Sequence, residues 1–403
     1  MSSKPRSEDN GGSSIGGPLR GNDVRARNEK LILELIQTRG ELSQSEASHE
    51  TGLRPPTVFR IFTNLEQQAF IVEARERPAD PDRRGRRPVY YAVNREVRYA
   101  VGVDLWSGSV AATLVDFARE AVVNDMEVFE PGKPIDEVLV RVENVVERLI
   151  ERAGIDRERL LGIGIGVPGV IDLDHGVVQS YDRIPGMSNT PVAQRLSEYF
   201  AVPVLMHNNT TVIAGSEYRY GTLQGSDSVM AILIRSGVGG AFLQKGQPFT
   251  SRGRTAVELG HTIVDPHAHA QGQSGTLESL VNEDELFRRL AEACGPADRQ
   301  SLIQCLSAGH EAPVRALSEP AEALGAAIVS LSNLFNPSVF LVISRYGVLS
   351  EYLAREAERY ARRDVPGTLL KPAEIRSCEY DPLRACRGAA DLVFDRFFSQ
   401  VND

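Results

Sequence analysis

The sequence Met206-His207-Asn208-Asn209-Thr210-Thr211 joins a short apolar strand, predicted from Val204 to Met206, to a helix that starts near Asn209 and runs to Tyr218. A strand that feeds directly into a helix is typical of α/β domains. Further along, Glu258-Leu259-Gly260-His261 adds a carboxylate and an imidazole, and Leu277-Glu278 adds a second carboxylate. Amides and carboxylates held by a rigid scaffold suit a polyhydroxylated ligand, because each hydroxyl both donates and accepts hydrogen bonds.

The chain from Tyr99 onward reads as two similar α/β halves that each open with antiparallel strands. The predicted elements are strands at Val101–Leu105, Val110–Asp116 and Leu160–Val167, a helix at Ile135–Ala153, strands at Val229–Ile234 and Val339–Ile343, and helices between about residues 283 and 333. The run Ser236-Gly237-Val238-Gly239-Gly240 follows the strand that opens the second half. This arrangement predicts a two-lobed body of the actin-like ATPase architecture.

The composition is that of a soluble globular protein in a reducing compartment. No apolar run approaches the ~20 residues of a membrane helix, and the first residues lack the pattern of an export signal. Four cysteines, Cys294, Cys305, Cys378 and Cys386, show no paired spacing, so we expect buried thiols rather than disulfides. We therefore expect a cytoplasmic protein with no membrane partner.

The charge is distributed unevenly along the chain. The total is −9, but residues 1–98 carry 17 Lys and Arg against 14 Asp and Glu, whereas the remainder carries 28 against 40. A basic amino-terminal module on an acidic body favours contact with nucleic acid at one end only.

Three helices are predicted after a disordered leader of about residues 1–22. In the first helix Leu31, Ile32, Leu35 and Ile36 fall on one face, and Arg39-Gly40 ends it. Ser43 and Glu46 have the spacing of a capping box for the second helix. The third begins near Pro55-Pro56, since proline is tolerated in a first helical turn.

The second and third helices, joined by the turn at Gly52, form a helix-turn-helix pattern whose last helix would enter the major groove of DNA. We expect Thr57 and Arg60 to face the bases, with Arg54 at the start of this helix, where a capping serine is usual. Val58, Ile61 and Leu65 would hold the helix to its own core.

A two-stranded wing is predicted from Ile71–Glu73 and Val89–Val93. Its tip, Arg83-Arg84-Gly85-Arg86-Arg87-Pro88, is the most basic run in the chain. Arginine runs are often solvated loops, but at wing distance from a helix-turn-helix, Arg84, Arg86 and Arg87 suit the narrow minor groove of A·T-rich DNA. We therefore predict a winged helix-turn-helix domain over residues 24–95.

The order of several motifs resembles the ROK family of repressors and sugar kinases, from about Asn28 to Phe397. The motifs are the basic wing ending in Gly85-Arg86-Arg87-Pro88, Val167-Pro168-Gly169, Ser236–Gly240, Glu258-Leu259-Gly260-His261, Leu277-Glu278 and Asn336-Pro337. The wing is similar to that of the repressor branch. The resemblance implies an α/β fold with a winged helix-turn-helix and a sugar-kinase-like body, here residues 99–398, that binds ligand and dimerises.

Departures from the kinase pattern indicate lost catalysis. Kinases of the family carry Asn-Asp where this chain has Asn208-Asn209, and that aspartate is the general base; the step is worth roughly 10²–10⁴-fold. Trp106 stands in the first phosphate loop, where the backbone must approach phosphate. Arg235 replaces a glycine ahead of the second loop, and Ser344-Arg345-Tyr346-Gly347 replaces a third. We predict no catalytic residues and no cofactor.

The resemblance places Asn208, Glu258, His261 and Glu278 at positions that bind sugar hydroxyls, with Asn209 beside them. Arg183, ahead of Ile184-Pro185-Gly186, stands where the family often has asparagine. An arginine there either favours an anionic sugar, such as a sugar phosphate or uronic acid, or faces solvent.

The resemblance also raises the question of zinc, which the family commonly binds through the histidine of Glu-x-Gly-His and three cysteines. No cysteine lies between His261 and Glu278. His267 and His269 are the other nitrogen ligands nearby, and thiolates are what close such a site. We predict no metal.

These observations predict a transcriptional regulator, most simply a repressor, that binds a palindromic operator as a homodimer, or as a tetramer, and responds to a carbohydrate. We expect the ligand to favour one angle between the lobes and so to change the distance between the two DNA-binding heads. Two alternatives remain: an active sugar kinase with an appended DNA-binding module, and a DNA-binding protein whose body serves only for dimerisation.

Overall fold

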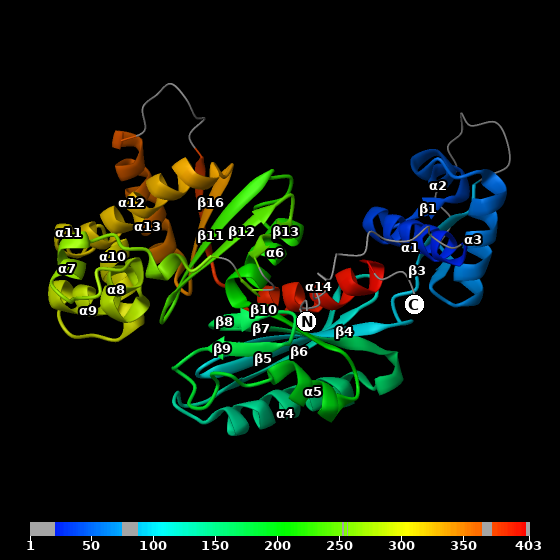
Figure 1. Ribbon diagram of the computed structural model, residues 1–403, viewed down its shortest axis with the longest axis horizontal. Helices are drawn as coiled ribbons and strands as arrows, with labels where there is room; N and C mark the ends of the chain where they lie inside the picture. Colours follow the sequence, from blue (N-terminus) through cyan, green and yellow to red (C-terminus); the bar gives the residue numbers. More distant parts are fainter. Residues whose placement is uncertain (1–20, 75–87, 252–253, 256, 365–372, 400–403) are drawn as a thin grey trace, which may run out of the picture. The chain divides into compact units, whose positions relative to one another are not determined.

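The computed structural model describes residues 21–74, 88–251, 254–255, 257–364 and 373–399, which form two compact units (Figure 1). Unit 1 holds the described residues up to Val97 together with those from Arg396 onward, and unit 2 holds Arg98–Asp395. The sequence predicted that the second domain ends at residue 398. In the structure the last turn of the C-terminal helix, from Arg396 onward, belongs to unit 1 instead. No helix among the described residues is long and apolar enough to cross a membrane.

Unit 1 has the three helices and the strands that its patterns predicted, with one added strand. Its elements are α1 (Gly21–Arg39), β1 (Leu42–Ser43), α2 (Gln44–Thr51), α3 (Pro55–Gln67), β2 (Ile71–Glu73) and β3 (Tyr90–Val93). The wing is a three-stranded sheet in the order β1-β3-β2, because Leu42 pairs with Tyr91. The two predicted wing strands are present as β2 and β3, which pair antiparallel, and β1 adds a third strand that the sequence did not predict.

The buried face of α1 differs by one position from the predicted face. Ile32, Leu33 and Ile36 are 0–2% exposed, whereas Leu31 is 45% exposed. The helix also begins at Gly21, so residues 21 and 22 are helical and do not belong to a disordered leader. The rest of that predicted leader lies outside the described residues.

The capping box predicted for α2 is present. The Glu46 amide donates to Ser43 Oγ at 3.3 Å, and the Ser43 amide donates to Glu46 Oε2 at 2.9 Å. Two amides that the helix cannot satisfy internally are thereby paired.

Replacing Ser43 with alanine should lower the free energy of opening of α2 by about 1 kcal/mol, because the Glu46 amide at the start of the helix loses its acceptor. Native-state hydrogen exchange of α2 amides would measure this. Glu46→Gln is the matched control, since glutamine retains the reciprocal bond and should cost less. Equal protection in Ser43→Ala and wild-type protein would contradict the role given to the cap.

The last turn of the C-terminal helix α14 (Pro382–Ser399) packs within unit 1. The Phe397 ring lies 6.0 Å from the Phe70 ring, and Lys30 Nζ lies 5.2 Å from the Phe397 centroid. A segment from the far end of the chain thus contributes a half-buried aromatic side chain to the N-terminal unit.

Unit 2 contains two five-stranded sheets of the same design, as the sequence predicted. The first, in the order β10-β7-β4-β5-β6, consists of β4 (Tyr99–Trp106), β5 (Ser109–Asp116), β6 (Ala121–Val128), β7 (Leu160–Val167) and β10 (Val204–Asn208). The second, in the order β13-β12-β11-β16-β17, consists of β11 (Ser228–Ile234), β12 (Val238–Gln244), β13 (Gln247–Pro248), β16 (Val339–Ser344) and β17 (Glu374–Glu379). In each sheet three antiparallel strands are extended by two parallel ones.

The remaining elements of unit 2 surround these sheets. A small sheet, β14-β15-β8-β9, consists of β8 (Val170–Asp172), β9 (Val177–Ser180), β14 (Thr250–Ser251) and β15 (Arg254–Thr255). The helices are α4 (Ile135–Ala153), a 3-10 turn η1 (Arg157–Arg159), α5 (Val192–Phe200), α6 (Asn209–Tyr220), a 3-10 turn η2 (Leu259–His261), α7 (Pro266–Ala270), α8 (Leu277–Val281), α9 (Glu283–Cys294), α10 (Arg299–Ser307), α11 (Glu311–Ala316), α12 (Ser318–Phe335), α13 (Gly347–Asp364) and α14.

Alternation along β7 explains how the first sheet is covered on both faces. Ile163, Ile165 and Val167 are fully buried in the core that includes α4 and α5. Glycines occupy the opposite face, where α14 lies directly on the sheet (Figure 1). A Cβ at Gly164 would lie 1.8 Å from Ala389 O, so no side chain fits there. This close approach fixes α14 against the sheet.

Helix α6 packs between the two sheets and is tied to α14 at its C-terminal end. Ile213 and Ala214 belong to the core that β11, β12 and β16 share. Arg219 forms ion pairs with Asp391 at 2.9 Å and with Asp395 at 3.1 Å. The Tyr220 hydroxyl donates to Asp391 at 2.8 Å. One end of α6 is therefore held by α14, and its other end begins at Asn208.

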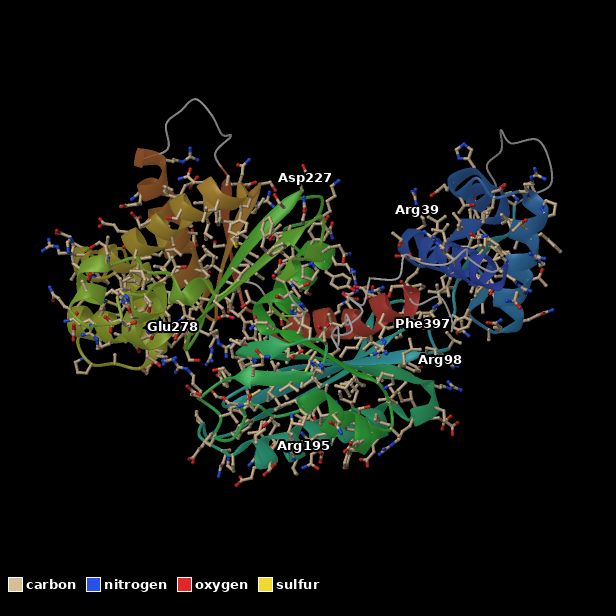
Figure 2. All side chains as sticks on the ribbon, viewed as in Figure 1. Arg39, Arg98, Arg195, Asp227, Glu278 and Phe397 are labelled. Carbon is tan, nitrogen blue, oxygen red and sulfur yellow. A yellow bond between two sulfur atoms is a disulfide. The ribbon has the colours of Figure 1, made fainter. Side chains whose placement is uncertain are left out.

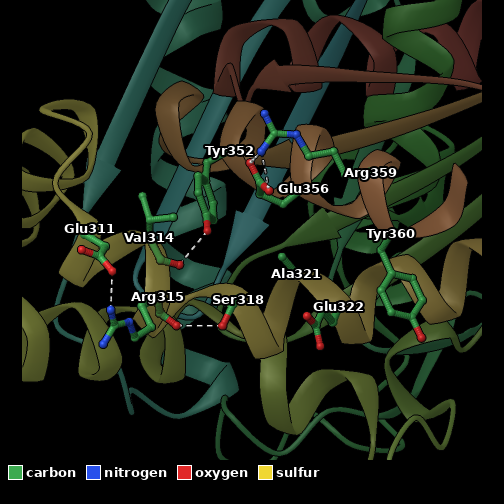
Figure 3. A pocket seen from close by; sticks show the side chains of 10 residues that line it. All are labelled: Glu311, Val314, Arg315, Ser318, Ala321, Glu322, Tyr352, Glu356, Arg359 and Tyr360. Carbon is green, nitrogen blue, oxygen red and sulfur yellow. Dashed lines mark hydrogen bonds and ion pairs between the residues drawn. The ribbon is translucent and has the colours of Figure 1, made fainter. Parts of the chain in front are cut away.

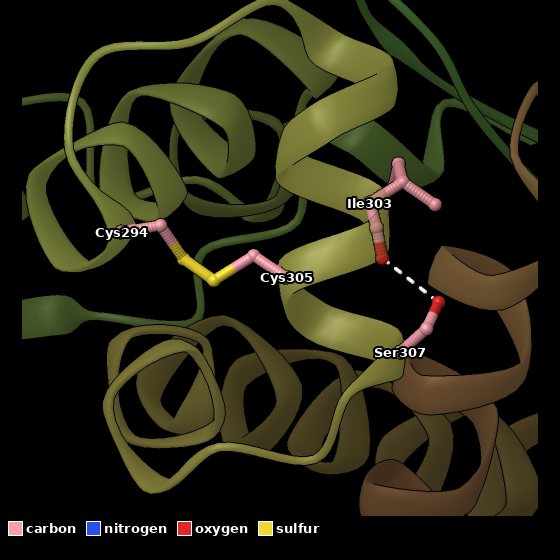
Figure 4. The surroundings of a disulfide bond; sticks show 4 residues. All are labelled: Cys294, Ile303, Cys305 and Ser307. Carbon is pink, nitrogen blue, oxygen red and sulfur yellow. Dashed lines mark hydrogen bonds between the residues drawn. A yellow bond between two sulfur atoms is a disulfide. The ribbon is translucent and has the colours of Figure 1, made fainter.

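The structure contradicts the expectation of four thiols. Cys294, at the end of α9, and Cys305, in α10, form a disulfide with their Cα atoms 6.7 Å apart (Figure 4). The turn between α9 and α10 folds one helix back on the other, which the spacing of the cysteines did not reveal. Cys378 and Cys386 remain thiols, and burial raises the pKa of both.

Candidate functional site

A cleft of about 310 Å³ in unit 2 brings together all six residues that the sequence proposed for ligand binding. The residues that line it are Trp106, Pro168, Gly169, Val170, Ser180, Tyr181, Asp182, Arg183, Asn208, Asn209, Thr210, Leu233, Arg235, Ser236, Gly237, Val238, Gly239, Gly240, Val257, Glu258, His261 and Glu278. Both sheets contribute to this lining, through the ends of β4, β10 and β11 and the start of α6. Polar groups from distant parts of the chain thus converge on one space, as ligand sites generally require.

The start of α6 places two amides in the cleft. Asn208 caps the helix, since its Oδ1 accepts from the Thr210 amide at 2.9 Å while its Nδ2 donates to Gly169 O at 3.0 Å. Asn209 is 1% exposed, and its Nδ2 donates to Asp104 Oδ1 at 2.8 Å. The Asn209 Oδ1 atom is buried with no hydrogen-bond partner. One acceptor thus remains unused beside the cleft.

Glu258, His261 and Glu278 come from η2 and the start of α8. Glu278 (labelled in Figure 2) accepts from the Val238 amide at 3.0 Å, which fixes its carboxylate against the glycine-rich turn. Partial burial raises the pKa of Glu258; His261 opposes this shift and Glu278 adds to it. Both carboxylates and the imidazole therefore share one electrostatic environment.

A buried stack closes one wall of the cleft. The Arg235 guanidinium carbon lies 3.9 Å from the Trp106 ring and 4.6 Å from the Tyr380 ring. Trp106 Nε1 donates to Asp104 Oδ2 at 2.7 Å, and the Tyr380 hydroxyl donates to the same oxygen. Burial raises the pKa of Asp104, and these hydrogen bonds oppose the shift. Sequence reasoning noted Trp106 and Arg235 separately but missed Tyr380 and the stack that joins them.

Arg183 turns toward the glycine-rich turn rather than away from the cleft. Its Nη2 donates to Ser236 O at 2.5 Å, although the residue remains largely exposed. Of the two alternatives that the sequence left open, the geometry favours a place in the cleft.

His207, next to this site, is buried and neutral. Its Nδ1 accepts from the Asn208 amide at 2.9 Å, and burial lowers its pKa to about 4. It does not line the cleft, so we regard it as a structural support for the start of α6.

The exposed side of α3 is the candidate DNA-binding face. Val58, Ile61 and Leu65 are 0–3% exposed and face the core, as predicted. Arg60 is exposed and Thr57 half-buried. Arg54 precedes the helix without a side-chain capping bond. Arg84, Arg86 and Arg87 lie outside the described residues.

Phe59 is a further candidate on this face, which sequence reasoning did not single out. It is 62% exposed, although it is a large apolar side chain in a helix with a well-buried opposite face. Apolar side chains on a recognition helix contact the methyl group of thymine. The sequence could have identified Phe59, because this residue falls outside the helical positions Val58, Ile61 and Leu65 that were predicted to face the core.

The donor set near His261 does not fit a zinc site. His267 and His269 lie two residues apart in α7, a spacing that does not bring side chains together on a helix. Among the described residues no group of three or more His, Cys, Asp or Glu side chains is placed to hold a metal. The absence of zinc stays a prediction, which metal analysis of the purified protein would test.

A second cavity, of about 260 Å³, lies between α11, α12 and α13 (Figure 3). Its charged groups largely pair among themselves: Arg315 with Glu311, and Arg359 with Glu356 at 2.9 Å. The Tyr352 hydroxyl donates to Val314 O. It therefore offers fewer unmet polar groups than the cleft at α6.

The fold and the cleft define a winged helix-turn-helix unit joined to a two-lobed domain of the actin-like type. The family model described as the ROK family matches residues 100–396, and the chain belongs to this family. It is 24% identical over 340 residues to the xylose repressor of Caldicellulosiruptor bescii, covering 80% of this chain and 84% of that protein.

Enzymes of the family also resemble the chain. Identity to the glucokinase of Thermotoga maritima is 26% over 275 residues, covering 61% of this chain and 83% of that enzyme. Among solved structures, a ROK family transcriptional regulator, described as a homolog of the Escherichia coli Mlc protein, aligns with a TM-score of 0.76 at 21% identity. It covers 93% of this chain and 97% of that one, which establishes the fold over both units.

Proposed function

We propose that this protein is a transcriptional repressor whose unit 1 binds operator DNA and whose unit 2 binds a carbohydrate effector that controls operator affinity. The observation that carries this proposal is Asn209. An amide stands where kinases of the family have the catalytic carboxylate, and it is locked to Asp104 at 2.8 Å at the floor of a retained polar cleft. An amide cannot take up the proton of a sugar hydroxyl, so the cleft is suited to sensing rather than to phosphoryl transfer.

The stack of Trp106, Arg235 and Tyr380 supports the loss of catalysis independently. By the resemblance, Trp106 and Arg235 stand in the two loops that would approach nucleotide phosphates, and the Arg235 guanidinium carbon lies 3.9 Å from the centroid of the Trp106 ring. A bulky, stacked pair leaves no room for backbone amides to surround a phosphate. We infer that the protein neither binds nucleotide there nor phosphorylates sugars.

Helix α6 offers a route from the effector to the rest of the molecule. It begins at Asn208 in the cleft and ends at Arg219 and Tyr220, which hold Asp391 of α14. The last turn of α14 belongs to unit 1. An effector that favours one angle between the lobes would shift α6, and α14 would carry this change toward the DNA-binding unit. The effector can shift this equilibrium only by its difference in affinity for the two states.

The proposed assembly is a homodimer in the cytoplasm that places two recognition helices on a palindromic operator. Two-fold protein symmetry matches operator symmetry, and half-sites lie about one helical turn apart. A tetramer would allow two operators to be held at once. The molar mass of the protein in solution, with and without DNA, distinguishes these states.

Operator binding across a salt series, with and without a panel of sugars, tests the proposal. DNA upstream of the protein's own gene provides the first probe. Tight binding that weakens steeply with salt and is released by a sugar is the expected result. If the protein binds the operator but no sugar changes its affinity, the DNA-binding role would stand and the effector role would be rejected.

Glu278→Gln should weaken effector-induced release of the operator. Loss of one charged hydrogen-bond partner costs about 1.5–3 kcal/mol, so the effector concentration for half-release should rise roughly ten- to hundredfold. Glu292→Gln removes a carboxylate from the exposed face of α9, where Glu292 pairs with Arg288, and serves as the matched control. Identical release curves for Glu278→Gln and the control would remove Glu278 from the proposed site.

A further inference from the structure

Two arginine residues lie at the turn that follows β11. Arg235 begins this turn, and its amide donates to Gly237 O at 2.8 Å. Arg183 reaches the same turn from the loop after β9 and donates to Ser236 O at 2.5 Å. Both arginines line the cleft that holds Asn208 and Glu278. Asp182, Glu258 and Glu278 line the same cleft, so the positive charge of its lining is confined to these two arginines.

Arg235 is also short of partners for a buried cation. It is 5% exposed, and its Nη1 is buried with no hydrogen-bond partner. Its Nε lies 4.0 Å from Glu283, beyond hydrogen-bond distance, while Arg299 approaches the other oxygen of that carboxylate at 3.1 Å. The rings of Trp106 and Tyr380 stabilise the guanidinium charge through cation–π interactions with its flat faces. They do not accept hydrogen bonds from the N–H groups in the plane of the guanidinium. Buried charges usually have a hydrogen-bonded counterion.

Asp104 attracts the Arg235 guanidinium electrostatically, but the described contacts include no hydrogen bond between the two side chains. The hydrogen bonds to the Asp104 oxygens come from Asn209, Trp106 and Tyr380. Among the described residues that line the cleft, three have a buried side-chain atom with no hydrogen-bond partner: Arg235 (Nη1), Asn209 (Oδ1) and Tyr181 (its hydroxyl). A ligand with an anionic group next to a hydroxyl would supply the partners that Arg235 Nη1 and Asn209 Oδ1 lack.

We propose that the effector is an anionic sugar derivative, carrying a phosphate or a carboxylate that binds between Arg235 and Arg183. A planar guanidinium donates two parallel hydrogen bonds to either group, which a hydroxyl cannot match. Glu258, Glu278 and Asn208 hold the ring hydroxyls, and the arginines select the charged substituent. This inference rests on the proposed function, because the ligand is the effector of operator binding.

The test compares matched neutral and anionic sugars on the full chain. The pairs are glucose with glucose 6-phosphate and with glucuronate, N-acetylglucosamine with its 6-phosphate, and xylose with xylonate. Calorimetric titration gives each affinity, and operator release is followed in parallel. We expect the anionic member of at least one pair to bind roughly tenfold or more tightly than its neutral counterpart. Comparison of the affinities for the sugar phosphates with those for the sugar carboxylates then identifies the charged group that the protein prefers.

Three variants assign that preference to the cleft. Arg183→Gln and Arg235→Met should each bring the anionic member to within about threefold of the neutral one. Arg195→Gln is the matched control, because it removes an equal charge from α5, where Arg195 pairs with Asp136. Because Arg235 is buried, the binding data for Arg235→Met are interpreted only if this variant unfolds cooperatively. If it does not, Arg183→Gln decides the question, because Arg183 is exposed and its replacement should not disturb folding.

The outcomes separate this inference from the proposed function. If a neutral sugar binds as tightly as its anionic partner and releases the operator, the anionic class is wrong and the repressor role stands. If the anionic preference survives both cleft variants, the charged group binds elsewhere and the inference fails. If no sugar of either kind binds or changes operator affinity, both proposals fail.

Discussion

A protein with Thr57 and Arg60 both replaced by alanine is expected to lose sequence-specific operator binding. Arg60 is exposed on the side of α3 that faces away from the buried Val58 and Ile61, and Thr57 is half-buried at the edge of the exposed side. A side chain that contacts a base edge contributes about 1–3 kcal/mol of specific binding, so the pair should cost roughly 2–6 kcal/mol. Non-specific binding should change little, because contacts to phosphates rather than to base edges supply it.

Fluorescence anisotropy with operator and with scrambled duplexes, at fixed salt, measures both affinities. Gln67→Ala, at the exposed C-terminal end of the same helix, is the control and should retain the preference for operator. Phe59→Ala should lose discrimination at a thymine position only. Wild-type operator affinity in the Thr57 and Arg60 double variant would mean that α3 is not the recognition helix.

The second large effect is expected for Asn209→Asp, the change that restores the residue found in kinases. It should destabilise unit 2 without creating a kinase. The new carboxylate would replace an Nδ2 atom that lies 2.8 Å from Asp104 Oδ1, in a place that is 1% exposed. An uncompensated buried charge costs about 3–5 kcal/mol. The stack of Trp106 and Arg235 would be unchanged by this substitution.

The destabilisation by Asn209→Asp should depend on pH in a defined direction. Two carboxylates at hydrogen-bond distance raise each other's tendency to hold a proton, and burial already raises the pKa of Asp104. When the pKa of a carboxyl group is higher in the folded protein than in the unfolded chain, the protein loses stability as the pH rises from the unfolded-state pKa through the folded-state pKa. The difference in unfolding free energy from wild type should therefore be smaller at pH 5 than at pH 8.

Urea unfolding at both pH values, with a sugar phosphorylation assay alongside, tests this prediction. Asn124→Asp introduces the same change on the exposed face of β6 and should have little effect at either pH. A variant as stable as wild type at pH 8 would show that Asn209 and Asp104 do not share a buried site. Phosphorylation of a sugar would revive the kinase alternative.

Strong periodicity made much of the fold predictable. The bounds of α4 match the predicted helix Ile135–Ala153, because its buried positions recur at helical spacing. Strand β6 was missed, since its outer face exposes Val122 and Met126 and its inner face pairs Asp125 with Arg148. The resulting mixture of polar and apolar residues gives no clean alternation.

The candidate site was partly predictable for a different reason. Its polar residues follow motifs, so local sequence located Glu258, His261 and Glu278. The stack around Arg235 required the folded chain, because Tyr380 lies 274 residues from Trp106. Similarly, the pairing of Cys294 with Cys305 depends on how α9 and α10 fold back on each other. Contacts that only tertiary packing creates were beyond local patterns.

The placement of Phe397 beside Phe70 has a consequence for the order in which the protein matures. Chains emerge from the ribosome N-terminal end first, and domains generally fold as they emerge. Here the first unit to be synthesised lacks the contact between Phe70 and Phe397 until α14 has been made. A nascent chain would thus hold an incomplete DNA-binding unit throughout translation of the sensor. Operator recognition would mature only after the sensing body exists, so an unregulated, half-made repressor would have little opportunity to occupy DNA.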